Sequence, residues 1–224
     1  MELSEVIKKR RSIRKYEDKE VSWNLISEIL DAARFAPAAG NVQSYKFIVI
    51  KDKEKRKSIS EACFNQEWIA SAPVHIVVCA TPSVLKKLYG ARGETSYSYQ
   101  NSSAAIQNLL LTAYDLGLGA CWVAAFDDKK VIELLEIPSD VKPIAIIILG
   151  YPKESPLTPR KDSLDTLVYF EKWKEKQRPE TAHQPMNKSI EKHVSKLKEF
   201  LKKINEPSEE QINNKFRFRI NGLK

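Results

Sequence analysis

Two long runs of apolar, mostly β-branched residues constrain the fold of this chain more than any other feature. One covers Val74–Ala80 and the other covers Pro143–Gly150. Continuous apolar runs of this kind are typical of strands that are buried within a sheet. Two further strands are predicted over Lys46–Ile50 and Cys121–Ala124. Because helical patterns lie between the strands, residues 1–170 are expected to form an α+β or α/β body.

Apolar residues recur at helical spacing between these strands. Ser22 is a predicted N-cap, and the helical pattern that follows it ends before Pro37. The longest predicted helix covers Gln100–Leu116, and small Ser and Ala residues fill its first half. Another helix can approach such a surface closely, which indicates a core element or a subunit interface. Asp127 or Asp128 is expected to cap a further short helix.

The chain changes character after Trp173, where strand formers become rare and Lys and Glu become frequent. Apolar residues there are spaced by four, three, four and three positions, which predicts an amphipathic helix over about 187–205. Strict alternation predicts a short strand over 215–220. We therefore expect two domains, a body over 1–173 and a basic C-terminal extension over 174–224.

The positive charge is concentrated near the C-terminus. The whole chain has a net charge of +8, of which residues 171–224 carry +6 and residues 1–170 carry +2. A solvated Lys- and Glu-rich appendage, or a helix packed on its own or a partner subunit, accounts for such a tail. Nucleic-acid or partner binding through the alternating Phe and Arg residues of 216–219 is the alternative.

Several common kinds of catalytic site are missing from the sequence. It contains no HExxH, GxxxxGK[ST] or GxSxG motif. Cys63, Cys79 and Cys121 have no CxxC partner and no metal-site spacing to a histidine. His75 stands within an apolar strand, which favours a core residue over a catalytic one. We therefore expect neither a metal site nor a hydrolytic centre.

The sequence predicts a cytoplasmic protein that does not span a membrane. The N-terminus lacks a basic region followed by an apolar stretch, so no secretory signal is expected. The longest apolar run lies around Ile144–Gly150 and is too short for a spanning helix. Unpaired cysteines agree with a reducing compartment.

Two cationic clusters are suited to binding an anion. Residues 10–14 read Arg-Arg-Ser-Ile-Arg, and in an extended backbone Arg10, Ser12 and Arg14 face the same side. Guanidinium groups form paired hydrogen bonds to phosphate oxygens, and a hydroxyl adds another donor. Arg160 and Lys161 form the second cluster. Taken alone, each cluster is also typical of a solvated charge run.

A third group of residues is suited to a flat ligand. Residues 37–43 read Pro-Ala-Ala-Gly-Asn-Val-Gln and lead into the first strand. The small residues leave room, while Asn41 and Gln43 offer amide donors and acceptors to a heterocycle. By itself this segment also fits an ordinary turn.

Taken together, these motifs follow an order that resembles the FMN-dependent nitroreductase family. The order is RRSIR, APAAGNVQ ahead of a strand, a long small-residue helix ending in LGLGACW, then LGYP and PRK. The resemblance covers about residues 1–173. It implies a nitroreductase-like α+β fold, a three-layer α/β/α sandwich whose central, mainly antiparallel sheet is flanked by helices. It also implies a homodimer with FMN at the subunit interface.

The resemblance implies a cofactor site without a catalytic side chain, because flavin N5 carries the chemistry. The implied positions are Arg10, Arg11, Ser12, Arg14, Arg160 and Lys161 for the phosphate, Ala38, Ala39, Asn41 and Gln43 for the ribityl chain and ring, Asn65 for the pyrimidine end, and Val123, Ala124 and Ala125 beside N5. Backbone N–H groups beside N5 would stabilise negative charge on the reduced flavin. The loop expected over Ser83–Gly93 is where family members differ over the substrate.

The implied activity is electron transfer from NADH or NADPH through FMN to a small-molecule acceptor in a ping-pong cycle. The acceptor would be a nitroaromatic, a quinone or a similar electron-poor compound. The alternatives are a dehalogenase-type relative, and a non-catalytic flavin-binding protein whose basic tail binds nucleic acid or a partner. The sequence departs from the family at Ser44 and Tyr45, where a Pro-Trp pair is frequent, and at Ala124, where some members have Glu.

Overall fold

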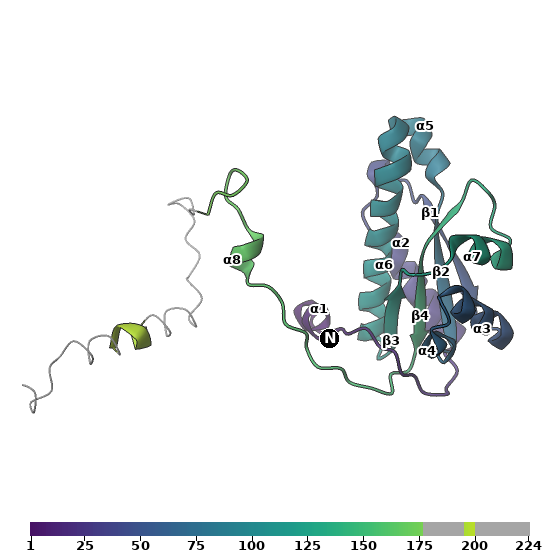
Figure 1. Cartoon of the computed structure of the whole chain (residues 1–224), viewed down its shortest axis with the longest axis horizontal. Coiled ribbons are helices and arrows are strands. Elements are labelled where there is room, and N and C mark those ends of the chain that lie inside the picture. Colours follow the sequence, from purple (N-terminus) through teal and green to yellow (C-terminus); the bar gives the residue numbers. More distant parts are fainter. Residues whose placement is uncertain (177–194, 200–224) are drawn as a thin grey trace, which may run out of the picture. The chain divides into compact units, whose positions relative to one another are not determined.

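The computed structural model describes residues 1–176 and 195–199 (Figure 1). The chain divides into two compact units, Met1–Pro159 and Arg160–Lys224, each of which is described by itself. Of the amphipathic helix predicted over about 187–205, residues 195–199 are described and are helical. The rest of that helix and the strand predicted over 215–220 lie outside the described residues. The division predicted at residue 173 stays a prediction.

An antiparallel sheet forms the centre of the first unit. Within the described residues it has four strands, in the order β1-β2-β4-β3. Every neighbouring pair is antiparallel. The strands are β1 (Tyr45–Ile50), β2 (Val74–Ala80), β3 (Gly119–Val123) and β4 (Lys142–Gly150). All four predicted strands are confirmed, and the two long apolar runs form the central pair, because central strands are covered on both faces and both edges.

The described helices are α1 (Leu3–Lys9), α2 (Trp23–Arg34), α3 (Lys53–Ala62), α4 (Glu67–Ala70), α5 (Pro82–Arg92), α6 (Ser98–Asp115), α7 (Asp128–Leu135) and α8 (Leu164–Leu167), with a 3-10 turn at Ala39–Asn41 and a π-helical turn η2 at Gly93–Tyr97. The helices predicted after Ser22, over Gln100–Leu116 and after Asp127 are confirmed as α2, α6 and α7. The loop expected over Ser83–Gly93 is wrong, because α5 occupies it. Pro82 stands in the first turn of α5, where its missing N–H costs nothing, and Leu85 is fully buried.

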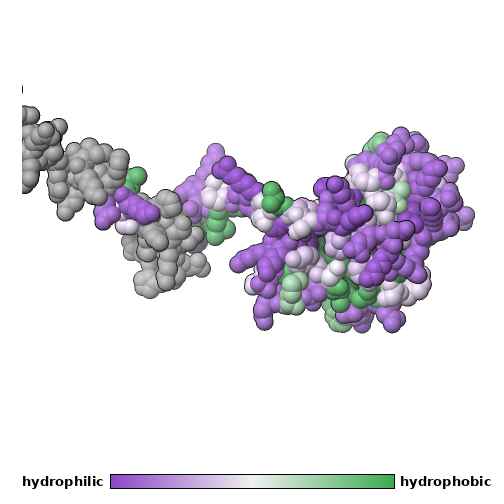
Figure 2. Space-filling model, turned by 90° about the horizontal axis from the view of Figure 1, so that it is seen from below, coloured by the Kyte–Doolittle hydropathy of each residue, from purple (hydrophilic) through white to green (hydrophobic). Residues whose placement is uncertain are grey.

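Helices cover both faces of the sheet, which confirms the three-layer sandwich (Figure 1). On one face, Ile76 and Ile147 belong to a core cluster with residues of α2 and α6. On the other face, Val77 and Ile148 belong to a second cluster with residues of α3, α4 and α7. Side chains of neighbouring residues in one strand therefore point to opposite faces of the sheet and pack in different core clusters. The outer surface visible in Figure 2 is mostly hydrophilic with separate apolar patches, and no described helix is long and apolar enough to cross a bilayer.

Helices α2 and α6 approach each other closely, as the small residues of α6 predict. Ala33 and Ala105 are both fully buried in the core cluster of that face. The Asn108 side chain of α6 donates a hydrogen bond to the Ala32 carbonyl of α2 at 3.2 Å. Small side chains allow this side-chain-to-backbone contact between the two helices.

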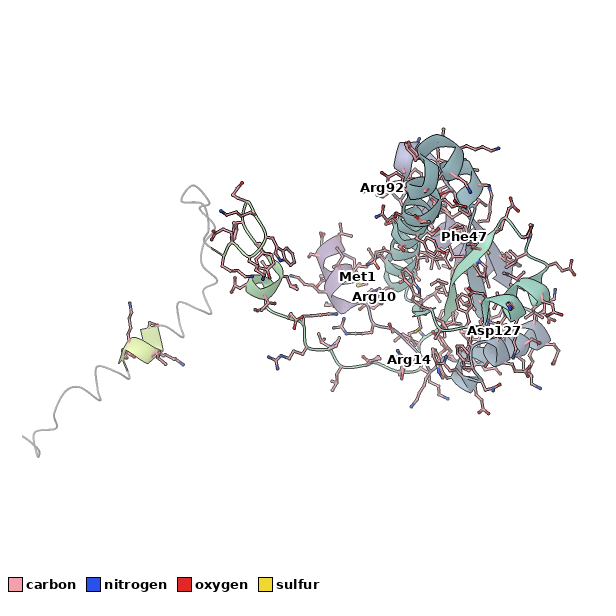
Figure 3. The ribbon with its side chains drawn as sticks, turned by 45° about the horizontal axis from the view of Figure 1, so that its top comes forward. Met1, Arg10, Arg14, Phe47, Arg92 and Asp127 are labelled. Carbon is pink, nitrogen blue, oxygen red and sulfur yellow. The ribbon has the colours of Figure 1, made fainter. Side chains whose placement is uncertain are left out.

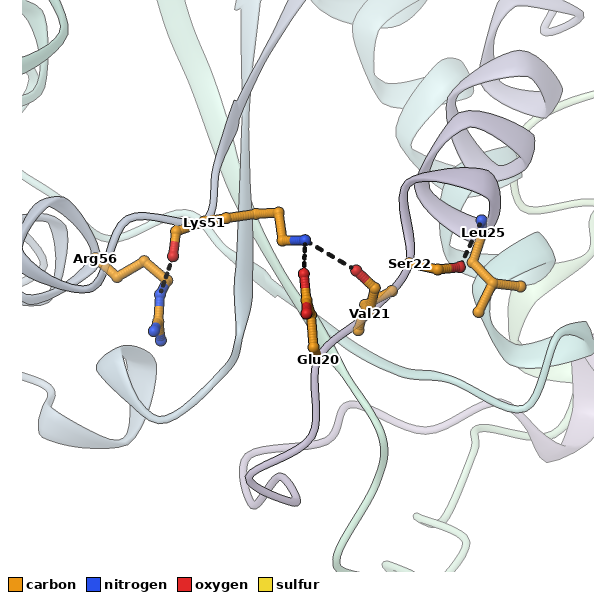
Figure 4. Close-up of polar contacts among 6 residues, drawn as sticks. All are labelled: Glu20, Val21, Ser22, Leu25, Lys51 and Arg56. Carbon is orange, nitrogen blue, oxygen red and sulfur yellow. Dashed lines mark hydrogen bonds and ion pairs between the residues drawn. The ribbon is translucent and has the colours of Figure 1, made fainter.

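Polar contacts fix the segment that joins the N-terminal region to α2 (Figure 4). The Lys51 ammonium, at the end of β1, pairs with Glu20 and donates to the Val21 carbonyl at 3.2 Å. Ser22 confirms its predicted role as N-cap, since its hydroxyl accepts from the Leu25 N–H at 3.4 Å. The start of α2 is therefore tied to one end of the sheet.

Candidate cofactor site

The arginine-rich segment runs along the free edge of β3. After α1 ends, Ser12 pairs in parallel with Ala120, and the Ile13 N–H donates to the Ala120 carbonyl at 3.1 Å. Glu154 accepts hydrogen bonds from the Arg14 N–H at 2.6 Å and the Lys15 N–H at 3.2 Å. These contacts hold residues 10–14 in the extended form that the sequence analysis required.

Arg10, Ser12 and Arg14 all lie near enough to Cys121 to affect the pKa of its thiol. Cys121 lies on the sheet face covered by α3, α4 and α7. Burial raises the pKa of Cys121, while the Arg14 charge, a hydrogen bond from Ser12 and the Arg10 charge oppose that rise. The Arg14 guanidinium also lies over the Trp68 ring, 5.5 Å from its centroid. The extended backbone agrees with the prediction that these three residues face one side, and that shared side stays a prediction.

Arg11 points elsewhere. Its guanidinium donates to the Lys8 and Arg10 carbonyls, both at 2.7 Å, and to the Thr158 hydroxyl. Its Nε is buried and has no hydrogen-bond partner in the described part of the chain. Arg11 lines a cavity of about 580 Å³ bounded by α1, the end of α6 and residues 152–158. The Arg11 guanidinium is therefore held by carbonyls and by Thr158, and its predicted contact with a phosphate stays a prediction.

Two other predicted segments lie beside the arginine segment. Asn65 is exposed and has a φ of 57°, so it forms a left-handed turn between α3 and α4. Helix α4 carries Trp68, which Arg14 covers. The Asp127 N–H donates to the Ala62 carbonyl at 2.8 Å, which fixes the chain just after β3 beside the same turn. The cationic segment, Asn65 and the end of β3 thus belong to one region of the sheet.

The end of β3 offers free backbone donors. Val123 is buried as the last residue of the strand, whereas Ala124 and Ala125 are exposed. Within residues 1–176 and 195–199, no hydrogen bond uses the N–H groups of Ala124 or Ala125. Exposed N–H groups next to a cationic segment are suited to a ligand that carries negative charge.

The small-residue turn is built around one buried amide. The Asn101 side chain of α6 accepts from the Ala39 N–H at 3.0 Å and donates to the Val42 carbonyl and the Ser44 hydroxyl, both at 3.1 Å. Gln43 donates to the Asn41 side chain at 3.1 Å, and both amides are exposed. The turn therefore presents two linked amide groups on a backbone that α6 fixes.

Asn101 is absent from the site predicted from the sequence, although a polar residue among the apolar positions of a long helix is a signal for a buried hydrogen-bonding role. It is a polar residue that is only 4% exposed among the apolar residues of α6. Gly40, within the turn, has a φ of 59° and lies so close to the Tyr89 hydroxyl that a Cβ there would collide with it. Tyr89 of α5 is the second residue that the sequence analysis missed.

The two halves of the candidate site lie at opposite corners of the sheet. Ser12 pairs with β3, whereas the turn enters β1 at the other edge, and three strand spacings of about 4.8 Å separate those edges. Ala120 stands level with Val74, while Tyr45 stands level with Ala80. At about 3.3 Å per residue, these two ends of β2 lie about 20 Å apart. One subunit therefore does not bring the arginine segment and the amide turn together.

The remaining predicted residues begin the second unit. Arg160 and Lys161 are both exposed and precede α8. Because that unit is described by itself, their predicted role in binding a phosphate stays a prediction.

The fold and the site define a class of protein: an α+β sandwich that carries a cationic segment at one sheet corner and an amide turn at another. The chain matches the family model of the nitroreductase family over residues 7–68 and 62–151. It therefore belongs to the nitroreductase family.

Individual relatives agree with this assignment. A Methanothermobacter thermautotrophicus protein, provisionally named an NADH dehydrogenase/NAD(P)H nitroreductase, is 40% identical to this chain over 178 residues. The matched residues cover 77% of this chain and 88% of that protein. It is 32% identical to an FMN reductase [NAD(P)H] of Bacillus subtilis, with 68% of each chain covered. An FMN-dependent nitroreductase from Clostridium difficile R20291 superposes with a TM-score of 0.65 at 30% identity, covering 75% of this chain and 98% of that one.

Proposed function

We propose that this protein is an FMN-dependent oxidoreductase that passes electrons from NADH or NADPH to electron-poor small molecules. The observation that carries the proposal is the pair of complementary half-sites, one cationic and one rich in amides, on a nitroreductase fold. Relatives named FMN reductase [NAD(P)H] and NAD(P)H nitroreductase support the same cofactors and donor.

The residues present fit FMN. Arg10, Ser12 and Arg14 alternate along a fixed, extended backbone and would present two guanidinium groups and a hydroxyl to a phosphate. Ala124 and Ala125 add exposed N–H groups without partners in the described part of the chain. Asn41 and Gln43 would pair with the polar edge of a heterocycle. Bound FMN would supply hydride acceptance from the nicotinamide and electron delivery to the acceptor.

The protein's own part is binding and orientation. The free N–H groups after β3 stabilise negative charge without changing protonation, because backbone amides do not titrate at neutral pH. The arginine segment anchors one end of the cofactor, and the fixed turn positions its ring. An acceptor quinone gains two electrons and two protons to become a hydroquinone, and water can deliver the protons to an open site.

We further propose a homodimer in which each cofactor lies between subunits. The arginine segment and the amide turn stand at opposite corners of one sheet, so a second copy has to supply one of the halves. A two-fold axis would then create two equal sites, each with an arginine segment from one subunit and a turn from the other.

An absorbance spectrum of the purified protein tests the cofactor first. Flavin bands that bleach on anaerobic addition of NADH or NADPH are the expected result. A protein that is colourless and takes up no added FMN would contradict the proposal. Sedimentation of the holoprotein as a monomer would contradict the shared site while leaving the cofactor assignment in place.

A further inference from the structure

Helix α5 and the π-helical turn η2 form a tight hairpin beside the amide turn, which we call the lid (residues 82–97). Gly90 breaks α5 with a φ of 64° and a ψ of −149°, a conformation open almost only to glycine. Gly93 packs so tightly on the Leu85 carbonyl that a Cβ would collide with it. Lys86 and Glu94 join the two arms by an ion pair at 3.0 Å. The conformation of the lid is therefore fixed by contacts within the lid itself.

Tyr89 brings the lid onto the candidate site. Its hydroxyl lies against Gly40 of the amide turn, so close that a Cβ on Gly40 would collide with it. Its ring is still 42% exposed. The ring of Tyr97 meets that of Tyr89 edge to face, with centroids 5.4 Å apart, which orients the exposed face of Tyr89. An open aromatic face thus stands next to the residues proposed to hold the flavin ring.

Arg92 adds a positive charge to this aromatic pair. Its guanidinium lies over Tyr97, 5.5 Å from the ring centroid, and its side chain is exposed. Within residues 1–176 and 195–199, neither Arg92 nor Lys87 makes an ion pair with a carboxylate, whereas Lys86 is neutralised by Glu94. Figure 3 places Arg92 at the end of the first unit opposite Arg10 and Arg14. Arg92 is therefore separate from the phosphate half of the site in its own subunit.

We propose that Tyr89 and Arg92 select electron acceptors that are planar and carry an anionic group. The acceptor ring would stack on Tyr89, and its carboxylate, sulfonate or phosphate would pair with the Arg92 guanidinium. The Arg92 guanidinium is accessible to such a partner because it is exposed and makes no ion pair within the described residues. This inference rests on the proposed function, since it names the acceptor class of that site.

The test isolates the oxidation step from the electron donor. Holoenzyme is reduced anaerobically with dithionite and mixed in a stopped-flow instrument with 1,4-naphthoquinone-2-sulfonate or with neutral 1,4-naphthoquinone. For each variant, the second-order rate constant with the sulfonate is divided by that with the neutral quinone. This ratio is then compared with the wild-type ratio, so that the intrinsic reactivities of the two quinones cancel. Arg92→Gln is expected to lower the sulfonate-to-neutral ratio about fivefold, as expected for the loss of an exposed charged pair with good geometry. Lys87→Gln, an exposed lysine of the same helix, is the matched control and should keep the ratio within about twofold.

Tyr89 has its own prediction in the same assay. Tyr89→Leu should slow both quinones by a similar factor, because it removes the stacking face and leaves the charge, whereas Tyr89→Phe should restore both rates. An unchanged ratio in Arg92→Gln, or an equal change in Lys87→Gln, would overturn the role of Arg92.

Two further outcomes separate this inference from the proposed function. If Arg92→Gln slows flavin reduction by NADPH but not by NADH and leaves the quinone ratio unchanged, the residue contacts the donor's phosphate and the acceptor proposal is wrong. If the wild-type protein binds no FMN, the proposed function fails and this inference falls with it. Normal FMN content and normal bleaching by NADH, with an unchanged quinone ratio, would overturn the acceptor selection alone.

Discussion

Asn101 of α6 accepts a hydrogen bond from the backbone N–H of Ala39 at 3.0 Å, across a sequence separation of 62 residues. The same amide also donates to Val42 and Ser44, so one side chain fixes both ends of the turn. Removal of the Asn101 amide leaves the Ala39 N–H, the Val42 carbonyl and the buried Ser44 hydroxyl without this partner.

Asn101→Ala should therefore loosen the turn and weaken FMN binding. We expect a loss of about 1–3 kcal/mol in unfolding free energy and about tenfold weaker FMN binding, measured by urea unfolding and by quenching of flavin fluorescence. Asn108→Ala is the matched control, because Asn108 lies on the same helix and makes a hydrogen bond to α2 instead of the turn. Equal FMN affinities in the two variants would contradict the role assigned to Asn101.

Arg14 allows a separate test of the phosphate half. Arg14→Ala should weaken FMN binding by about 10- to 100-fold, corresponding to about 1.5–3 kcal/mol for a charged hydrogen bond. The double change with Arg160→Ala should strip the cofactor on purification. The control is Lys15→Ala, whose side chain is exposed on the neighbouring position of the same extended segment. Flavin retention by the double variant at the wild-type level would sink the phosphate assignment.

The strands could be predicted from the sequence because their signal is local. Val74–Ala80 and Pro143–Gly150 are rich in β-branched residues, and such residues suit a covered, pleated surface. Helix α5 could not be predicted in this way, because Gly90 interrupts its periodicity. Its contacts with the rest of the chain include the burial of Leu85 and an ion pair from Lys86 to Glu94, which lies outside the helix.

The candidate site also contains residues that a local pattern predicts and residues that only distant contacts define. Arg10, Ser12 and Arg14 could be placed on one side from the period of an extended backbone alone. The separate role of Arg11 could not, because its guanidinium binds carbonyls and Thr158, which is 147 residues away in sequence. Asn101 and Tyr89 escaped notice for the same reason: their partners in the amide turn are distant in the sequence.

His75 should make stability depend on pH. It is fully buried, and its Nε2 lies 2.8 Å from the Ile69 carbonyl. The pKa of His75 is lowered to about 4, mainly because burial disfavours the charged form. The hydrogen bond to Ile69 raises this pKa in part, and the nearby Arg56 charge lowers it. The unfolded chain, with an ordinary histidine pKa near 6.5, binds more protons between about pH 4 and 6.5. Stability should therefore fall as pH decreases through that window and lose about 3 kcal/mol from this residue.

Urea unfolding at steps from pH 4.5 to 7.5 measures this dependence. His75→Gln is the comparison, because its amide nitrogen can keep the donor to Ile69 while it removes the titration. The slope of unfolding free energy against pH should be smaller in the variant than in the wild type. Equal slopes would contradict the assignment to His75.

Subunit complementation tests the shared site directly. Neither Arg14→Ala nor Asn101→Ala homodimers should have an intact site if the arginine segment and the turn come from different subunits. A mixed dimer would then hold one doubly altered site and one intact site, so about a quarter of the sites in a fully exchanged equal mixture should be intact. At an FMN concentration that leaves each variant largely unloaded, NADH-dependent quinone reduction by the mixture should therefore exceed the average of the two variants. The control is each variant mixed with itself under the same exchange conditions. If both halves came from one subunit, every site in the mixture would carry one change, and the activity would stay at the average of the two variants.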